Sequence, residues 1–421
     1  MDRTLQFLIF FSIIATVFGL IQWYVLKSYS RWLVKVASNQ AARRYRLAGY
    51  LLFALANILF LLRFPSTGLG FYQNPLFQSL IIYPGGIFFG SVVLAFIVLL
   101  MWNTGKRSIA FFRKIFYNEG EVQVRQFPSA VLHRTADTGL IDRRKFLKTA
   151  GTAMIAAPAF LTIGSSAATS HDYQVIRKRL YYPGLPDGLD GLRIVQISDI
   201  HSGIYMTETQ MRDIFHLANE QQPDLVAITG DFVDNSPAEI PALSRAVTDL
   251  KADIGIYGCL GNHDHYASAD EVSSAMSRQG IHILTNAHQT ITVHGEKLTL
   301  LGVDDIQSRT SNLARINAAA NRMPDDGFRI LLSHRPDLFD DARKRNIHLT
   351  LSGHTHGGQI GFNVLGVPFY PIHLFHDYAK GLYDFGDSKL YVNVGIGMVG
   401  VPVRLVRPEL TVIDLAKNPS A

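Results

Sequence analysis

Cysteine is almost absent from this chain of 421 residues, in which Cys259 is the single thiol. A disulfide framework needs paired cysteines and a zinc–thiolate site needs several, so the composition excludes both. Any metal ion that the protein binds must therefore be held by oxygen and nitrogen ligands.

Acidic residues are scarce in the first part of the chain. Residues 1–170 carry 18 Lys and Arg against 5 Asp and Glu, whereas residues 171–421 carry 22 against 29. The net charge of +6 is thus an average over a basic part and an acidic part. The basic residues flank apolar runs and form no uniform patch, so we expect separate structural units and no nucleic-acid partner.

Long apolar runs are confined to the basic part, at residues 5–26, 47–62 and 80–102. The first and third reach the roughly 20 residues that cross a bilayer, and the second is extended by flanking Tyr45, Arg46 and Arg63. We predict a membrane region at residues 1–104 with three transmembrane helices. The lipid bilayer is accordingly an expected partner.

Basic residues in the connecting loops set the expected orientation of these helices. Six Lys and Arg lie between the first two runs and ten follow the third, but none lies between Arg63 and the third run. Because positively charged loops stay in the cytoplasm, the N-terminus is expected outside and residues 105–148 form a basic cytoplasmic linker.

A fourth apolar segment at residues 149–168 follows the sequence "RRKFLK". The combination resembles a twin-arginine export signal, although Asp142 stands where Ser or Thr is usual and the segment is internal. An ordinary fourth transmembrane helix is the alternative, and both interpretations place residues 171–421 outside the cytoplasm. With three helices before it, we expect the segment to tether the protein rather than to be cleaved near Ser165–Ala167.

From Tyr173 onward, short apolar runs end in polar clusters and alternate with stretches of helical spacing. This alternation predicts an α/β domain at residues 171–421, with its site at the carboxyl ends of the strands. The predicted strands lie at residues 192–201, 224–234, 254–264, 298–305, 328–337, 348–358, 389–397 and 410–415, and the clearest predicted helices at 211–222 and 241–252.

The polar residues at these strand ends form a constellation of carboxylates, one amide and imidazoles. Such mixed ligands suit Mn, Fe, Zn or Mg in a catalytic site. They exceed what one ion with an open position needs, whereas two ions that share a bridging carboxylate would use them all. The constellation consists of Asp199, His201, Asp231, Asn262, His263, His334, His354 and His356.

The spacing of these residues has a geometric interpretation. Side chains two positions apart in a strand point to the same side, so Asp199 and His201 are expected to reach one ion together. The same holds for His354 and His356 if that segment is extended.

The motifs "SDIH", "GDFVD", "GNHD", "SH" and "GHTH", in this order, resemble the calcineurin-like metallophosphoesterase family across residues 190–415. The later "GHTHGGQIG", "KGLY" and "LYVNVGIG" are similar to a bacterial subgroup of membrane-associated phosphohydrolases, which includes twin-arginine-exported members and relatives from lipid A biosynthesis. The resemblance implies an αββα sandwich for the soluble domain. Together with the apolar runs and the loop charges, it predicts a multi-pass protein of the bacterial inner membrane, with the catalytic domain outside the cytoplasm.

Carried over residue by residue, the resemblance implies two divalent metal ions and one catalytic histidine. His263 would be the catalytic histidine, close to the phosphate and the leaving group, and Asp264 would orient it if the chain turns there. One metal would take Asp199, His201, Asp231 and His356, and the second would take Asp231, Asn262, His334 and His354.

The expected mechanism follows from charge. Two cations about 3.5–4 Å apart clamp phosphate oxygens and supply a hydroxide that attacks phosphorus in line, while His263 protonates the leaving oxygen. Three nearby residues keep two interpretations each. Asp234 and Asp337 either serve the site or cap local structure, Arg335 contacts either phosphate or a surface acid, and Asp304 and Asp305 are expected in a turn.

The loop at residues 361–381 is rich in aromatic residues. It either touches the bilayer interface and admits a lipid-linked phosphoester, or packs over the sheet. The residues concerned are Phe362, Phe369, Tyr370, Phe375 and Tyr378.

The sequence therefore predicts a membrane-anchored hydrolase of a phosphodiester or pyrophosphate bond. Relatives point to lipid precursors such as UDP-2,3-diacylglucosamine, which is made in the cytoplasm, whereas the predicted topology places the domain outside. The alternatives are a phosphodiesterase acting on soluble envelope substrates and a membrane sensor or scaffold with a phosphoesterase-like domain. The presence of every expected ligand favours an enzyme, and the absence of charge within the apolar runs disfavours a transporter.

Overall fold

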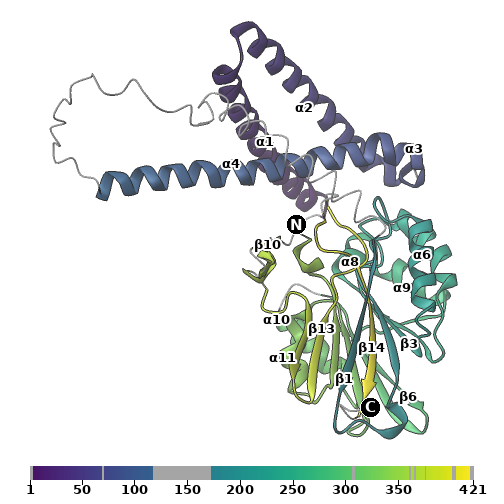
Figure 1. The fold of residues 1–421 in the computed structure, drawn as a ribbon. Coiled ribbons are helices and arrows are strands. Elements are labelled where there is room, and N and C mark those ends of the chain that lie inside the picture. The colour runs from purple at the N-terminus through teal and green to yellow at the C-terminus, as the bar shows by residue number, and fades with distance from the viewer. Residues whose placement is uncertain are drawn as a thin grey trace. The chain divides into compact units, whose positions relative to one another are not determined.

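The computed structural model describes residues 3–68, 71–116, 172–305, 309–359, 362–364, 367–374, 376–400 and 404–417. The chain divides into two compact units (Figure 1). The first consists of Met1–Leu59 and Gly85–Gly164, and the second of Phe60–Pro84 and Ser165–Ala421. The predicted fourth apolar segment at 149–168 and most of the predicted cytoplasmic linker lie outside the described residues.

Each of the three N-terminal apolar runs lies in a long helix. They lie in α1 (Arg3–Val36), α2 (Asn39–Gly68) and α4 (Tyr83–Phe116), which the π-helix Gln78–Ile82 precedes. Among the described residues, the stretches Asn39–Leu62 and Pro75–Ser108 have the length and hydropathy to cross a membrane. Membrane crossing by α1 stays a prediction. The helices extend past the apolar runs because Arg, Lys and Gln are good helix formers.

Polar side chains join the helices of the first unit. The side-chain amides of Gln22 in α1 and Asn57 in α2 exchange two hydrogen bonds of 2.8 Å. The amide of Asn103 in α4 donates to the Tyr24 hydroxyl at 2.6 Å. Hydrogen bonds between apolar helices fix which faces meet, because an unpaired amide is costly in an apolar environment.

The second unit contains a sandwich of two six-stranded sheets, ordered β1-β14-β2-β3-β4-β5 and β12-β13-β9-β8-β7-β6. The first consists of β1 (Gln174–Tyr181), β14 (Glu409–Ala416), β2 (Arg193–Ile197), β3 (Leu225–Thr229), β4 (Gly255–Cys259) and β5 (Ile281–Ile283). The second consists of β12 (Gly381–Phe385), β13 (Ser388–Val392), β9 (Leu349–Ser352), β8 (Phe328–Ser333), β7 (Glu296–Val303) and β6 (Ala287–Val293).

The strands that carry the predicted site are parallel. In the first sheet β2, β3 and β4 are neighbours, and in the second β7, β8 and β9 are neighbours. Antiparallel pairs occur where β14 meets β2, β12 meets β13 and β6 meets β7. The carboxyl ends of the central strands of each sheet therefore lie at a common edge.

Helices cover the outer faces of both sheets. On the first sheet lie α6 (Glu208–Asn219), α7 (Ile240–Ala246), α8 (Asn262–Ala267) and α9 (Ala269–Arg278), and on the second α10 (Arg309–Ala319) and α11 (Phe339–Arg343). One apolar cluster joins α6, α7 and α9 to β2–β4, and another joins α10 and α11 to β7 and β8. The predicted fold class, an N-terminal helical region followed by an αββα domain, is confirmed.

The main core lies between the sheets and comes from the central strands of both. Strands that are buried on both faces consist of continuous apolar runs, so these strands could be predicted from the sequence. Its members include Ile194, Leu225 and Tyr257 from the first sheet and Leu300, Ile330 and Leu351 from the second. The sequence did not predict the strands that lack such runs. They are the partly exposed edge strands β1, β6 and β12 and the short hairpin of β10 (Phe362–Val364) and β11 (Val367–Phe369).

Candidate metal centre

The predicted ligands follow the carboxyl ends of five strands at one edge of the sandwich. Strands β2, β3 and β4 in one sheet and β8 and β9 in the other all end within a few residues of a predicted ligand. The register of the parallel pairs brings these ends level with one another. Residues from distant parts of the chain consequently converge there.

The first cluster consists of Asp199, His201 and His356, all buried. His356 Nε2 lies 3.3 Å from Asp199 Oδ1 and 3.1 Å from His201 Nε2. The distance from His201 Nε2 to Asp199 Oδ1 is 4.0 Å. Two imidazole nitrogens and a carboxylate oxygen thus face one point, an arrangement that suits a divalent cation.

The second cluster consists of Asp231, His334 and His354. His334 Nε2 lies 3.2 Å from Asp231 Oδ2 and 3.2 Å from His354 Nδ1. The same Asp231 Oδ2 atom lies 3.5 Å from His201 Nε2 in the first cluster. Asp231 therefore stands between the two clusters, as a bridging carboxylate must.

Asn262 lies beside the second cluster, as the first residue of α8. Its side-chain oxygen is 3.4 Å from Arg335 Nη2, and Nη1 of the same arginine is 2.7 Å from His354 Nε2. The amide and the second cluster are thus linked through one guanidinium group.

The backbone that carries these ligands is left-handed, not extended. Strand β2 ends at Ile197 and β9 at Ser352, so the ligands after them lie in loops. The expectation that Asp199 and His201, or His354 and His356, project from one strand is wrong. Instead, the turns that αL residues produce aim these side chains at the site, at φ values of 52° for Asp199, 47° for His201, 52° for Asp231, 70° for His354 and 49° for His356.

Two glycines leave room for the ligand carboxylates. A Cβ atom on Gly261 would collide with Oδ1 of Asp231, and one on Gly353 would collide with Ser198 Oγ and Asp199 Oδ2. A side chain at either position would displace a ligand, so the backbone there approaches as closely as only glycine permits.

Asp234 faces two histidines of the site. Its Oδ1 atom is 3.5 Å from His201 Nδ1 and 3.6 Å from His263 Nδ1. Burial opposes protonation of His201, but the carboxylates of Asp234, Asp231 and Asp199 around it hold its pKa above the usual value. A carboxylate beside Nδ1 favours the tautomer in which Nε2 is free for a metal, and this position agrees with the interpretation that Asp234 serves the site.

His263 begins the turn into α8, beside both clusters. Its backbone N–H donates to Asp231 Oδ1 at 2.9 Å, and its ring meets that of His201 edge-on at 4.6 Å. Nδ1 contacts the backbone oxygen of Asp234, which leaves Nε2 for other partners. Burial, with His201 next, lowers the pKa of His263.

Asp264 does not orient His263. Its carboxylate accepts backbone N–H groups of Gly261 at 2.8 Å, Phe232 at 2.8 Å and Val233 at 3.2 Å. The chain turns into α8 there as expected, but the turn sends Asp264 into the interior, and burial raises its pKa to about 7. Asp264 thus joins two strand-end loops, and the carboxylate facing His263 is Asp234.

The remaining acids near the site form ion pairs. Asp304 Oδ1 lies 2.6 Å from His265 Nε2 and its Oδ2 lies 3.2 Å from Arg315, while Asp305 Oδ1 lies 2.7 Å from Arg335 Nε. Asp337 is exposed in the first turn of the 3-10 helix Pro336–Leu338, which agrees with the local structural interpretation.

Arg404 is a buried residue that sequence reasoning missed. Its guanidinium donates to the backbone oxygens of Val394 at 2.6 Å and Gly395 at 2.7 Å, and its Nε donates to Val406 at 2.8 Å. The loop after β13 that it holds packs against Asp199, because a Cβ on Gly395 would strike that side chain. The glycines of "NVGIG" were the available signal.

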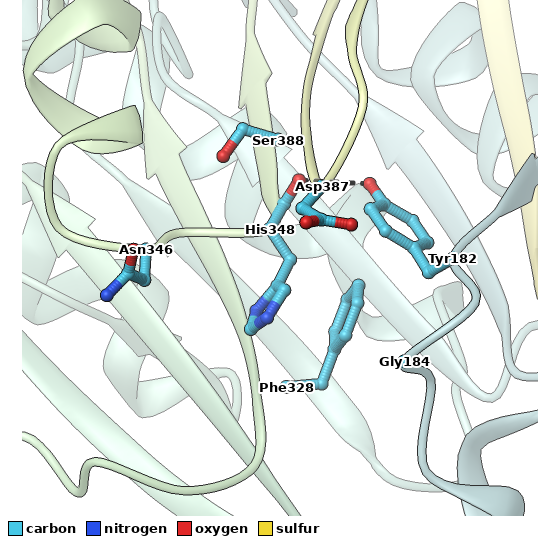
Figure 2. A pocket seen from close by; sticks show the side chains of 7 residues that line it. All are labelled: Tyr182, Gly184, Phe328, Asn346, His348, Asp387 and Ser388. Carbon is cyan, nitrogen blue, oxygen red and sulfur yellow. Dashed lines mark hydrogen bonds between the residues drawn. The ribbon is translucent and has the colours of Figure 1, made fainter.

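A separate cavity of about 330 Å³ lies at the opposite edge of the second sheet (Figure 2). The strands β8, β9 and β13 begin there, whereas the metal clusters follow the ends of β8 and β9. His348, which belonged to no motif, stacks on Phe328 in its wall at 4.7 Å. This cavity is not part of the candidate metal centre. Its lining consists of Tyr182, Gly184, Phe328, Asn346, His348, Asp387 and Ser388.

Comparison with known proteins agrees with the geometry of the two clusters. The model of the family described as calcineurin-like phosphoesterase matches residues 192–358. The chain is 33% identical over 293 residues to the uncharacterized metallophosphoesterase YkuE of Bacillus subtilis, covering 98% of that protein and 65% of this chain. The chain belongs to the calcineurin-like metallophosphoesterase family.

Other metallophosphoesterases match a similar share of the chain. Phosphodiesterase YaeI of Escherichia coli is 27% identical over 286 residues, which are 66% of this chain and 100% of that protein. The "transmembrane protein with metallophosphoesterase domain" of Danio rerio is 32% identical over 244 residues, 55% of this chain and 54% of that protein. As a metallophosphoesterase, this chain is a metal-dependent phosphoric ester hydrolase, as the sequence predicted.

Proposed function

We propose that this metallophosphoesterase is a membrane-anchored enzyme that holds two divalent cations and hydrolyses a phosphodiester or pyrophosphate bond. The observation that supports it best is Asp231 Oδ2, which lies 3.5 Å from a histidine of one cluster and 3.2 Å from a histidine of the other. Mn, Fe, Zn and Mg all suit the donor set. One cation would be held by Asp199, His201, Asp231 and His356, and the second by Asp231, Asn262, His334 and His354.

The residues present fit such ions. The site combines buried carboxylates and imidazoles, whose charges and lone pairs face one another at 3.1–3.5 Å. His334 Nδ1 contacts the Thr229 oxygen at 2.8 Å, so its Nε2 can present a lone pair to an ion. Burial lowers the pKa of His354 to about 2, which keeps that imidazole unprotonated.

When bound, the two cations polarise phosphate oxygens and provide a hydroxide nucleophile at neutral pH. The side chains of the protein would position the substrate and protonate its leaving group. His263 contacts the Asp234 backbone oxygen through Nδ1, which leaves Nε2 to donate a proton to the leaving oxygen when the ring is protonated. Its side chain is 19% exposed, so substrate can reach it.

We further propose that the catalytic domain lies outside the cytoplasm. Support comes from the connector between the apolar stretches Asn39–Leu62 and Pro75–Ser108, in which Arg63 is the only Lys or Arg. Tyr72 of this connector is buried in one cluster with Ile204 and Tyr205 of the catalytic domain. This contact supports a connector and a domain on the same side of the membrane, and a connector with a single basic residue favours the outer side.

The crossing between the basic linker and the catalytic domain is proposed to be the segment at 149–168, acting as a twin-arginine-like tether of a multi-pass inner-membrane protein. A domain that is exported after it has folded can bind its metal ions before it leaves the cytoplasm.

The proposed substrate is a lipid-linked phosphoester. One such compound is UDP-2,3-diacylglucosamine of lipid A biosynthesis, which contains a pyrophosphate bond. Contact of the connector with loop residues 204–205, close to His201, supports a site near the bilayer. The proposed outer location favours a phosphodiester of the envelope instead, lipid-linked or soluble. Of the aromatic loop, Tyr378 packs on Phe339 and donates a hydrogen bond to Asp340, which favours packing within the domain for this residue.

The experiment that tests this function is hydrolysis of a generic phosphodiester by purified, Mn²⁺-loaded chain. Asp231→Asn should bind fewer than two Mn²⁺ and lose at least roughly 100-fold in turnover, because even partners of metal ligands contribute up to that much. Profiling of lipids and nucleotides in membranes treated with either protein identifies the natural substrate. Wild-type protein that binds Mn²⁺ yet hydrolyses neither diester nor envelope lipid would favour the sensor or scaffold.

A further inference from the structure

Arg335 is held at the edge of the metal centre by a buried acid. It directly follows the predicted ligand His334, and its Nε lies 2.7 Å from Asp305 Oδ1. The Asp305 side chain is only 2% exposed and that of Arg335 is 18% exposed. The pair is thus no surface contact, and Asp305 fixes the plane of the guanidinium.

The other side of this guanidinium faces two predicted metal ligands. Nη1 lies 2.7 Å from His354 Nε2, and Nη2 lies 3.4 Å from Asn262 Oδ1. In this arrangement one positive group contacts His354 and Asn262, two of the four ligands predicted for the second cation.

This arrangement and a bound metal exclude each other. Arginine only donates hydrogen bonds, so His354 Nε2 must accept, and its proton then sits on Nδ1. Nδ1 points at His334 Nε2, 3.2 Å away, where the second cation would bind. With a metal ion held at Nδ1, the proton of His354 would lie on Nε2, and with one held at Nε2 that lone pair would be occupied. In both cases Arg335 would lose its acceptor, while Asp305 would still hold its Nε.

We propose that Arg335 is a phosphate-binding residue of this site, released from His354 and Asn262 when metal binds and then directed at a non-bridging oxygen of the substrate phosphate. The inference rests on the proposed phosphoesterase function. Its two Nη groups form a planar fork that matches two phosphate oxygens, and Asp305 positions it in advance.

The test compares the Mn²⁺-loaded full chain with Arg335→Gln and Arg335→Lys, using inorganic phosphate as the probe. Phosphate affinity, measured by calorimetry, should fall roughly 10- to 100-fold in Arg335→Gln, the range that charged hydrogen bonds provide, and less in Arg335→Lys. KM for the diester should rise by a similar factor. Two Mn²⁺ per chain should remain, with equal or higher Mn²⁺ affinity because the competing cation is gone.

Arg315→Gln is the matched control, because Arg315 pairs with the adjacent Asp304 at 3.2 Å and is 19% exposed. It should leave phosphate affinity unchanged. Unchanged phosphate affinity in Arg335→Gln overturns the proposal, and so does loss of Mn²⁺ or an equal effect in Arg315→Gln. Calorimetry needs no turnover, so it reports on Arg335 even if the wild-type chain hydrolyses no diester.

Discussion

The candidate chemistry depends on where individual nitrogen and oxygen atoms point. Asp231 Oδ2 lies between the two clusters, and Asp234 lies behind the imidazoles of His201 and His263. The second-layer carboxylate matters because a histidine can bind a metal through Nε2 only if Nδ1 holds its proton. We therefore expect the last aspartate of "GDFVD", Asp234, to orient these imidazoles rather than to bind a metal ion.

Replacing Asp234 by Asn should lower metal affinity or turnover roughly 10- to 100-fold. The Asp234 charge raises the pKa of His263, so its removal should lower that pKa further. The acid form of His263 is then lost at a lower pH, and the alkaline limb of the pH–kcat/KM profile should shift downward. Kinetics from pH 5 to 9 measure this.

Asp337→Asn is the control for that variant, since Asp337 also lies near a predicted ligand but is exposed. This substitution should leave the pH–kcat/KM profile unchanged. A pH profile for Asp234→Asn that coincides with wild type would contradict the orienting role.

At the scale of elements, the predicted ligands lie in the loops that follow the strands, and the strands set where these loops begin. Five ligands have positive φ, a conformation that costs on the order of 1–3 kcal/mol per residue and persists where its surroundings enforce it. The loop that follows Asp231 is held by Glu239, whose Oε2 accepts the N–H groups of Asp234 at 2.9 Å, Asn235 at 2.8 Å and Ser236 at 3.1 Å.

Glu239 should make stability depend on pH. Burial, and then the charge of Asp234, raises its pKa from 4.5 to about 8. An acid with a raised pKa in the fold favours folding while protonated, so this contribution is complete below about pH 4.5 and is lost as pH rises to about 8. The loss has a limiting slope of about 1.4 kcal/mol per pH unit.

Glu239→Gln should remove that dependence, because an amide keeps the acceptor and carries no charge. Thermal unfolding at pH 5, 7 and 9 should show a smaller decrease for the variant than for wild type. Parallel decreases in both proteins would show that Glu239 is ionised in the fold at neutral pH.

At the scale of the whole molecule, a basic helical part joins an acidic catalytic part through a segment outside the described residues. The proposed topology puts the basic linker inside and the C-terminus outside. A reporter active only outside the cytoplasm should work when fused after Ala421 and fail when fused after Arg125. Strong activity of a cytoplasm-only reporter after Ala421 would overturn the topology.

The sequence by itself determined the sandwich strands, the apolar helices and the residues that gather at the site. Buried parallel strands and long apolar helices leave continuous apolar runs, and metal ligands follow strand ends in recognisable motifs. Edge strands such as β1 and β12 were not predicted, because partly exposed strands contain no continuous apolar run.

Only the tertiary structure decided how the site residues are aimed and paired. The left-handed backbone of Asp199 and His354, the placement of Asp234 rather than Asp264 behind His263, and the contact of Arg335 with His354 all depend on segments far apart in the chain. Side-chain direction and hydrogen-bond partners are set by close packing and by competition for donors and acceptors. Residue spacing alone does not encode either.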